Sequence, residues 1–166
     1  CVGRRDTFQN SRGGFMRTLK KVALASGKTL LIRTYEPPDY PAIRDNLKAE
    51  EMFDEIRDSE ESLHRMISEN SDAILVATVD NQIVGSLFLL INGLRADIYR
   101  LVVTELFRGK GVVDKLLQAA EETLRTKGIK RVGLFYRANN HKLGKFYGRR
   151  GWQKLPFLHQ AMCKDL

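Results

Sequence analysis

Three apolar segments separated by tight turns constrain the fold of this chain most strongly. Residues 73–79 form a continuous apolar run that ends at an Asp-Asn pair, and residues 83–91 form a second run that ends at Asn92-Gly93. Residues 97–103 form the third run. An Asn-Gly pair between apolar runs is a strong hairpin signal, because both residues tolerate the positive φ angles of a two-residue turn. Turns this short join antiparallel strands, so we predict an antiparallel meander.

Other patterned segments predict helices and further strands around this meander. Residues 29–35 are rich in β-formers and end at a Pro-Pro pair, which stops a strand. Residues 112–127 carry apolar residues at helical spacing and precede Gly128, a residue suited to ending a helix. Three further helices are expected: one at 39–51, one that begins at a capping box formed by Asp58 and Glu61, and one at 139–149. Two further strands are expected, at 130–136 and 154–164.

The first 27 residues lack the period of a helix or a strand. Residues 1–15 contain three glycines and mostly polar side chains, so we expect a mobile tail upstream of a natural start at Met16. Residues 1–27 together predict a flexible, basic N-terminal extension. Residues 28–166 are then expected to form a single domain, a size at which roughly 70% of the unfolded surface is buried.

Composition excludes several classes of protein. Hydrophobic residues make up 43% and charged residues 29% of the 166 residues, which is typical of a folded globular chain. No apolar run reaches the roughly 18–20 residues of a membrane helix, so no membrane partner is expected. Cys1 and Cys163 are the only cysteines, and the three histidines are scattered. We therefore expect no disulfide scaffold and no metal site, and a reducing, cytoplasmic location.

The net charge of +8 is unevenly distributed. Residues 1–35 carry a net +7, and residues 95–166 carry +10, because sixteen Lys and Arg face six acids there. Residues 36–72 carry −8, from twelve acids and four bases. The average alone suggests an anionic partner such as nucleic acid or a phosphate-bearing ligand. The distribution instead indicates an acidic segment between two basic ones.

A glycine-containing turn precedes the helix expected at 112–127. It reads Arg108-Gly109-Lys110-Gly111. Glycine lets a backbone approach a ligand closely, and the free N–H groups at a helix N-terminus favour an anion. The spacing matches neither a Walker loop nor a dinucleotide fingerprint. By itself such a turn is as often a tight connection as a phosphate site, so both interpretations remain open on the turn alone.

A second motif near the C-terminus accompanies this turn. Asn140 is followed by Tyr147 after six residues, and Tyr147 by Gly151-Trp152 after three. Together with the L-V-V-x4-R-G-K-G pattern of residues 101–111, this closely resembles the GNAT superfamily of acyl-CoA-dependent N-acetyltransferases. The resemblance covers roughly residues 28–166. It implies a mixed α/β fold with a central, mostly antiparallel sheet of six to seven strands, splayed in the middle and flanked by about four helices.

The resemblance also implies acetyl-CoA as the acyl-donor substrate. In this family the amides of the turn hold the CoA pyrophosphate, and the preceding strand and a later Asn contact the pantetheine arm. These roles fall here on Leu101, Val102, Val103, Arg108, Gly109, Lys110, Gly111, Val112, Val113, Asp114 and Asn140. Val113 departs from the family, which usually has Gly or Ala there. The first three side chains are also expected in the core, and the Asn is also expected to cap a helix.

For catalysis, the resemblance implies direct attack of an amine on the thioester. Tyr147 matches the family's general acid, and a phenol with a pKa near 10 suits protonation of a departing thiolate. The other interpretation of Tyr147 is a core tyrosine beside Phe146 and Trp152. The general base is not marked by the family pattern. Asp97 is our first candidate, ahead of Glu105, a water relay, or an amine that arrives unprotonated.

Two early helices border the acceptor side of the cleft in this family, and here they are acidic. We therefore expect a cationic acceptor, such as a polyamine, an aminoglycoside-like amine or a peptide N-terminus, bound by a monomer or homodimer. A solvated acidic helix face is the competing interpretation. A non-catalytic acyl-CoA-binding sensor of the same fold is the alternative function. A nucleic-acid-binding module is less favoured, because no binding motif accompanies the charge, so no nucleic-acid partner is expected.

Overall fold

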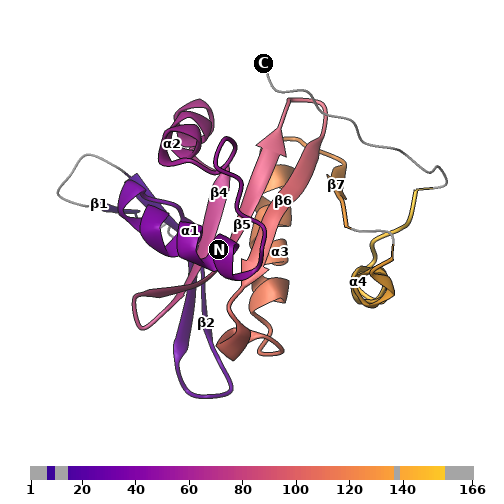
Figure 1. Cartoon of the computed structure of the whole chain (residues 1–166), viewed down its shortest axis with the longest axis horizontal. Coiled ribbons are helices and arrows are strands. Elements are labelled where there is room, and N and C mark those ends of the chain that lie inside the picture. Colours follow the sequence, from indigo (N-terminus) through magenta and orange to yellow (C-terminus); the bar gives the residue numbers. More distant parts are fainter. Residues whose placement is uncertain (1–6, 10–14, 137–138, 156–166) are drawn as a thin grey trace, which may run out of the picture. The chain divides into compact units, whose positions relative to one another are not determined.

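The computed structural model of the chain describes residues 7–9, 15–136 and 139–155. The chain divides into two compact units, residues 1–134 and residues 135–166, and each is treated by itself. The first unit contains a seven-stranded sheet whose spatial order follows the sequence (Figure 1). Its strands are β1 (Thr7–Gln9), β2 (Phe15–Ala23), β3 (Thr29–Thr34), β4 (Ile74–Val79), β5 (Gln82–Ile91), β6 (Ala96–Val103) and β7 (Val132–Leu134).

The sheet confirms the predicted meander and the mostly antiparallel fold class. Every neighbouring pair of strands is antiparallel except β6 and β7, which run parallel. A parallel pair needs a crossover, and the connection from β6 to β7 contains helix α3 (Val112–Thr126). The other helices are α1 (Tyr40–Ala49), α2 (Glu60–Glu69) and α4 (His141–Gly148), with short 3-10 turns at Pro37–Asp39 and Glu105–Phe107.

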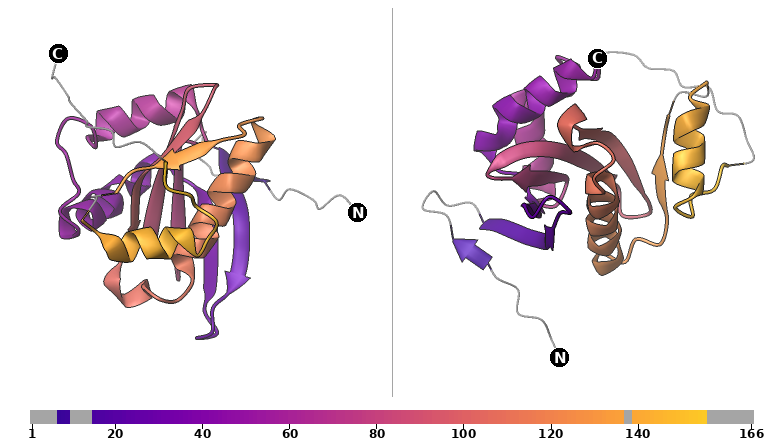
Figure 2. Two further views of the ribbon diagram at one scale, coloured as in Figure 1. Left: turned by 90° about the vertical axis from the view of Figure 1, so that its right-hand side faces the viewer. Right: turned by 90° about the horizontal axis from the view of Figure 1, so that it is seen from below.

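The helices of the first unit cover opposite faces of the sheet. Figure 2 shows α1 and α2 on one face and α3 on the other. The α1/α2 face buries a cluster that includes Ile43, Leu47 and Leu63 against Phe88 and Val102 of the sheet. On the other face, α3 buries its apolar stripe, namely Val112, Leu116, Leu117, Ala120 and Leu124. Two apolar faces, each covered by an amphipathic helix layer, give the sheet its position in the core.

Gly85 allows α3 and β6 to approach β5 closely. A Cβ atom at this position would lie 2.9 Å from the backbone oxygen of Val102, 3.1 Å from Cγ2 of Val103 and 3.4 Å from Cδ1 of Leu116. Contacts below 3.0 Å are not found for real Cβ atoms, so a side chain here would push strand β6 away. The glycine inside this apolar run therefore serves packing, not a turn.

Strands β6 and β7 pair only along the first three residues of β6. Their register pairs Ala96 to Ile98 of β6 with the whole of β7. Immediately beyond, β6 contains a bulge, because the register to β5 passes from Phe88↔Tyr99 to Ser86↔Val102. Arg100, inside this bulge, has a φ of +50°. A left-handed conformation costs a residue with a side chain about 1–2 kcal/mol, which the surroundings must offset.

The N-terminal part of the chain differs from the prediction. Residues 15–23, expected within a flexible extension, form β2, which pairs antiparallel with β3. Arg17 and Lys20 in β2 also form ion pairs with Asp72 and Glu122. The sequence of β2 does not predict a strand, because its apolar and basic residues do not alternate cleanly. Its pairing with β3 is what stabilises the strand. The boundary expected at residue 28 therefore lies inside a β-hairpin.

Two smaller differences concern element ends. The N-cap of α2 is Ser59, whose hydroxyl accepts a hydrogen bond from the Ser62 amide; Asp58, expected in that role, lies one residue earlier and is buried. The strand expected at 130–136 is confined to β7, while the strands expected at 154–164 lie almost entirely outside the described residues. The helix expected at 112–127 and its terminating glycine, at a φ of +75°, are confirmed.

Candidate active site

The end of β6 leads directly into the glycine-containing turn. The Thr104 amide donates to the carbonyl of Val84, and a 3-10 turn at Glu105–Phe107 brings the chain to Arg108. Gly109 and Gly111 follow with φ angles of +71° and +79°. A Cβ at either glycine would have no atom within 4 Å, so a steric clash does not explain why glycine is present. The positive φ angles do, because glycine adopts them without strain.

Helix α3 begins at this turn with its first amides directed away from the helix body. Gly111 is the N-cap and, having no side chain, makes no side-chain cap of its own. Free N–H groups and the helix dipole make such an end attractive to an anion. Lys110 adds a positive charge, with its ammonium 5.1 Å from the ring centre of Phe107. Val112, Val113 and Asp114 form the first turn, as expected.

Arg108 lies where three elements meet. Its Nε donates to the carbonyl of Val103 at 3.2 Å, and its Nη2 forms an ion pair with Glu50 at the end of α1. Both Arg108 and Glu50 are partly exposed, with side-chain accessibilities of 49% and 34%. The guanidinium is therefore held beside the turn by the carbonyl of the buried Val103 and by the partly exposed carboxylate of Glu50.

Of the three strand residues expected beside the cofactor arm, whose side chains were also expected in the core, two are buried. Val102 and Val103 are 4% and 6% exposed and belong to the core, and Leu101 is half-buried. Val102 and Val103 pair with Ser86 and Gly85 of β5. Arg100 and Leu101 fall between the paired positions, opposite a single β5 residue, Leu87. In a bulge the extra residue is left out of the hydrogen-bonded pairing between the two strands. Leu101 is therefore the position where a backbone N–H or C=O group of β6 can bind a partner other than β5.

Asp97, the candidate base, lies on β6 opposite Gly133 of β7. Its carboxylate accepts a hydrogen bond from Arg95 Nη2 at 2.5 Å and is 24% exposed. A Cβ atom on Gly133 would overlap this carboxylate, so the glycine makes room for it. Asp97 and Leu101 are four positions apart, a distance of roughly 13 Å along an extended strand. Glu105, the second candidate, is exposed in the 3-10 turn.

The remaining predicted residues lie in the second unit, on α4. Asn140 is its N-cap, and Oδ1 accepts a hydrogen bond from the Leu143 amide at 3.1 Å, so the capping interpretation is confirmed. The half-buried ring of Tyr147 lies 5.2 Å from Phe146 and 5.9 Å from Trp152, both edge-to-face. Burial raises the pKa of the Tyr147 phenol, and the positive charge of Arg150 opposes this in part. The phenol is therefore protonated at neutral pH.

Several acids expected to border the acceptor side are already engaged. Glu50 pairs with Arg108, Asp54 with Arg57, and Asp58 with Arg100. The exposed acids of this segment that remain for an incoming cation are Glu51, Glu55, Glu60 and Glu61. The segment is thus less negative towards solvent than its sequence charge indicates, because part of that charge anchors arginines of β6 and of the turn.

Sequence reasoning missed the pairing of Asp58 with Arg100. The Asp58 side chain is fully buried and that of Arg100 is 11% exposed, with Nε–Oδ1 and Nη2–Oδ2 distances of 3.0 and 2.8 Å. One signal was present: Arg100 is a charge within an otherwise apolar strand pattern, and such a charge needs a buried partner. Its partner, 42 residues earlier, is marked by no local pattern.

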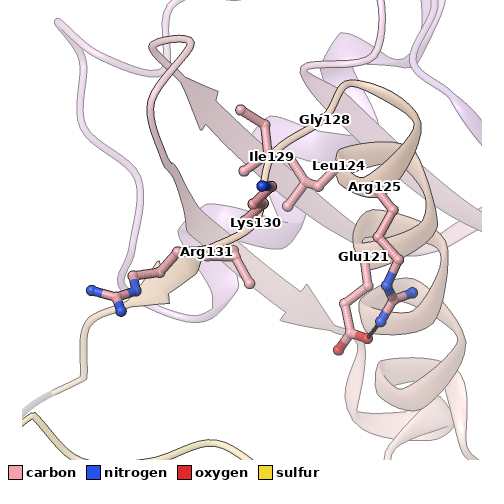
Figure 3. Close-up of a pocket in the computed structure, with 8 residues that line it drawn as sticks. Glu121, Leu124, Arg125, Gly128, Ile129, Lys130 and Arg131 are labelled. Carbon is pink, nitrogen blue, oxygen red and sulfur yellow. Dashed lines mark hydrogen bonds and ion pairs between the residues drawn. The ribbon is translucent and has the colours of Figure 1, made fainter.

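A pocket of about 470 Å³ lies at the other end of α3, away from the turn (Figure 3). It is lined by Leu124, Arg125, Ile129 and neighbouring residues up to Val132, and Arg125 is paired with Glu121 at 2.8 Å. Among the residues that the structure describes, no cluster of three or more His, Cys, Asp or Glu is arranged to hold a metal. None of the described helices has the length and apolarity to cross a membrane.

Comparisons with known proteins match this chain to one family. The model of the acetyltransferase (GNAT) family matches residues 31–152. An acetyltransferase of Pectobacterium atrosepticum is 29% identical over 109 residues, which cover 66% of this chain and 77% of the relative.

Two solved structures share the fold. Ard1 from Thermoplasma volcanium has a TM-score of 0.65 at 23% identity and covers 74% of this chain and 81% of its own. The PaiA N-acetyltransferase from Thermoplasma acidophilum, in complex with coenzyme A, has a TM-score of 0.62 at 21% identity, with coverages of 73% and 87%.

Proposed function

Because the chain belongs to the acetyltransferase (GNAT) family, we propose that it moves an acetyl group from acetyl-CoA to a primary amine. The observation that carries the proposal is the end of β6 running into a positive-φ glycine turn at the N-terminus of α3. This arrangement suits a pyrophosphate, which needs several N–H donors and a favourable dipole. The structural neighbour from T. acidophilum, solved with coenzyme A, supports the same ligand.

In this proposal the first unit binds the donor. The amides of residues 109–114 hold the pyrophosphate, with Arg108 and Lys110 supplying positive charge. The β6 backbone from Leu101 to Val103 runs beside the pantetheine arm, and one of its N–H groups polarises the thioester carbonyl. Val113 is half-buried on the first turn of α3, so its branched side chain limits how closely the cofactor approaches the helix.

The chemistry is one acyl transfer by direct attack. The amine nitrogen forms a bond to the carbonyl carbon, the carbon–sulfur bond breaks, and Tyr147 gives its phenolic proton to the sulfur. The attacking amine loses a proton to Asp97, through water because of the length of strand between Asp97 and Leu101, and solvent returns a proton to Tyr147. A buried phenol with a raised pKa remains protonated until the thiolate forms, which suits a general acid.

Tyr147→Phe tests the role of the phenol, and Tyr136→Phe is a matched control. Tyr136 lies in the same unit, with its ring 6.1 Å from that of Tyr147, and the substitution likewise removes one hydroxyl. We expect Tyr147→Phe to lower kcat by roughly 10²–10⁴-fold, the usual worth of a general acid. Tyr136→Phe should stay near wild type. Equal activity of the two variants would refute the assigned role, and CoA binding without turnover by the wild type would favour the sensor alternative.

For the acceptor we propose a cationic amine, such as a polyamine, an aminoglycoside-like amine or a basic peptide N-terminus. The exposed carboxylates Glu51, Glu55, Glu60 and Glu61 support this, because an acidic border raises the local concentration of cations. The test is kcat/KM across a panel of amines of different charge, each at low and high salt. Cationic amines should react fastest and lose rate with salt. Best activity on neutral or acidic amines, insensitive to salt, would contradict the proposal.

A further inference from the structure

The bulge of β6 is held from outside the sheet by a buried ion pair. Arg100 Nε donates to Asp58 Oδ1 at 3.0 Å, its Nη2 lies 2.8 Å from Oδ2 in an ion-pair contact, and its guanidinium carbon lies 4.3 Å from the centre of the Tyr99 ring. Arg100 is the residue with the positive φ angle, and its pairing partner is fully buried. Glycine or asparagine adopts this left-handed conformation more readily than arginine. The ion pair made by the Arg100 side chain offsets the cost of that conformation.

Asp58 in turn organises the segment that follows α1. Its Oδ2 accepts a hydrogen bond from the Asp54 amide, and its own amide donates to the Asp54 carbonyl, both at 2.8 Å. Ser59, the next residue, caps α2. One carboxylate therefore closes the loop between α1 and α2 and at the same time binds the β6 bulge. The Asp58–Arg100 ion pair therefore joins the acidic segment to β6, the strand proposed to run beside acetyl-CoA.

We infer that Asp58 and Arg100 are positioning residues for acetyl transfer: their ion pair fixes the direction of the β6 backbone at Leu101. The inference rests on the proposed function, which assigns a role to that backbone. Leu101 follows Arg100 directly and lies in the same bulge, beyond the last residue that pairs with β7. Without the ion pair, the side chain of Arg100 no longer offsets its left-handed conformation, and the backbone at Leu101 can turn away from its present direction. The pair touches no reacting atom and acts through the backbone.

The chain offers a matched control in a second buried Arg–Asp pair. Arg33 Nη1 and Nη2 donate to the two carboxylate oxygens of Asp39 at 2.6 and 2.8 Å, and the side chains are 12% and 11% exposed. This pair joins β3 to the turn before α1. Like the first pair, it brings two guanidinium nitrogens against two carboxylate oxygens at a similar burial, and β4 and β5 separate β3 from β6 in the sheet. A purely structural role predicts the same consequences for both pairs.

The variants are Asp58→Asn and Arg100→Lys, with Asp39→Asn and Arg33→Lys as controls. For each we would measure kcat with acetyl-CoA and the best amine, the Kd of CoA by calorimetry, and amide hydrogen exchange over residues 99–103. Asp58→Asn should lower kcat about tenfold or more, since small displacements of reacting groups are costly, with the Kd of CoA nearly unchanged. Exchange at 99–103 should speed up. The controls should lose thermal stability and keep kcat.

Equal kcat for Asp58→Asn and Asp39→Asn would overturn the inference. If Asp58→Asn does not fold, Arg100→Lys becomes the test, because it keeps a cation beside Asp58 and loses only the second nitrogen that contacts the carboxylate. A kcat equal to that of Arg33→Lys would then overturn the inference. Wild-type protein that releases no CoA with any amine refutes the proposed function instead. Hydrogen exchange then still tests the ion pair, since unchanged protection at 99–103 in Arg100→Lys would show that the pair does not hold the bulge.

Discussion

Gly85→Ala introduces one methyl group where β5, β6 and α3 meet. The new Cβ would lie 2.9 Å from the backbone oxygen of Val102, and an ordinary contact at this position requires about 3.4 Å. The neighbour is backbone, fixed by the β5–β6 ladder, and cannot rotate away, while Leu116 limits movement towards α3. Strand β6 must therefore shift by roughly 0.5 Å, and overpacking of this kind costs about 1–3 kcal/mol.

For a chain of this length each kcal/mol corresponds to about 2–4 °C in Tm, so scanning calorimetry should show a fall of roughly 2–12 °C. Because the shifted residues are Val102 and Val103, kcat should also fall, by about tenfold. Gly148→Ala is the control: Gly148 has ordinary helical φ and nothing within 4 Å of a Cβ, so Tm should hold or rise slightly. An unchanged Tm for Gly85→Ala would refute the packing argument, and an unchanged kcat would separate β6 from the chemistry.

Three further predictions concern the turn, the candidate base and the phenol. Gly111→Ala strains a residue at φ +79°, and the Kd of CoA measured by calorimetry should rise about tenfold. Gly27→Ala is the control: it is equally strained, at +81° in the β2–β3 turn, and should leave this Kd unchanged. Gly133→Ala displaces the Asp97 carboxylate at little cost in Tm, because an exposed ion pair contributes under about 1 kcal/mol; if Asp97 is the base, kcat falls, and full activity would exclude it. The raised pKa of Tyr147 places its ionisation above the ordinary value of 10.0, so the acid form is lost only as pH rises beyond it; a tyrosinate difference titration against Tyr147→Phe that shows ionisation below that value would contradict this.

The meander and the crossover helix could be predicted because local chemistry determines them. Asn92-Gly93 and Gly128 are short-range signals, and the apolar stripe of α3 repeats at helical spacing over four turns. β2 could not be predicted in the same way. Two of its basic residues, Arg17 and Lys20, pair with Asp72 and Glu122, far away in sequence, and single-strand patterns do not record such partners.

The candidate site shows the same division. The glycine turn and the Asn140 cap follow from residue types at fixed offsets, and both adopt the conformations that those offsets predict. The bulge at Arg100 and its pairing with Asp58 follow from tertiary contact between β6 and the loop before α2. A capping-box pattern at Asp58 and Glu61 pointed to a local role for Asp58, but Ser59 performs it and leaves the carboxylate for Arg100.

We propose that this chain transfers acetyl groups from acetyl-CoA to amines. The most direct measurement is mass spectrometry of a panel of primary amines after incubation with purified protein and acetyl-CoA that carries a deuterated acetyl group. We expect at least one amine to gain the deuterated acetyl group, with release of an equal amount of CoA and much slower product formation by Tyr147→Phe. Binding of CoA with no labelled amine at any protein concentration would contradict it.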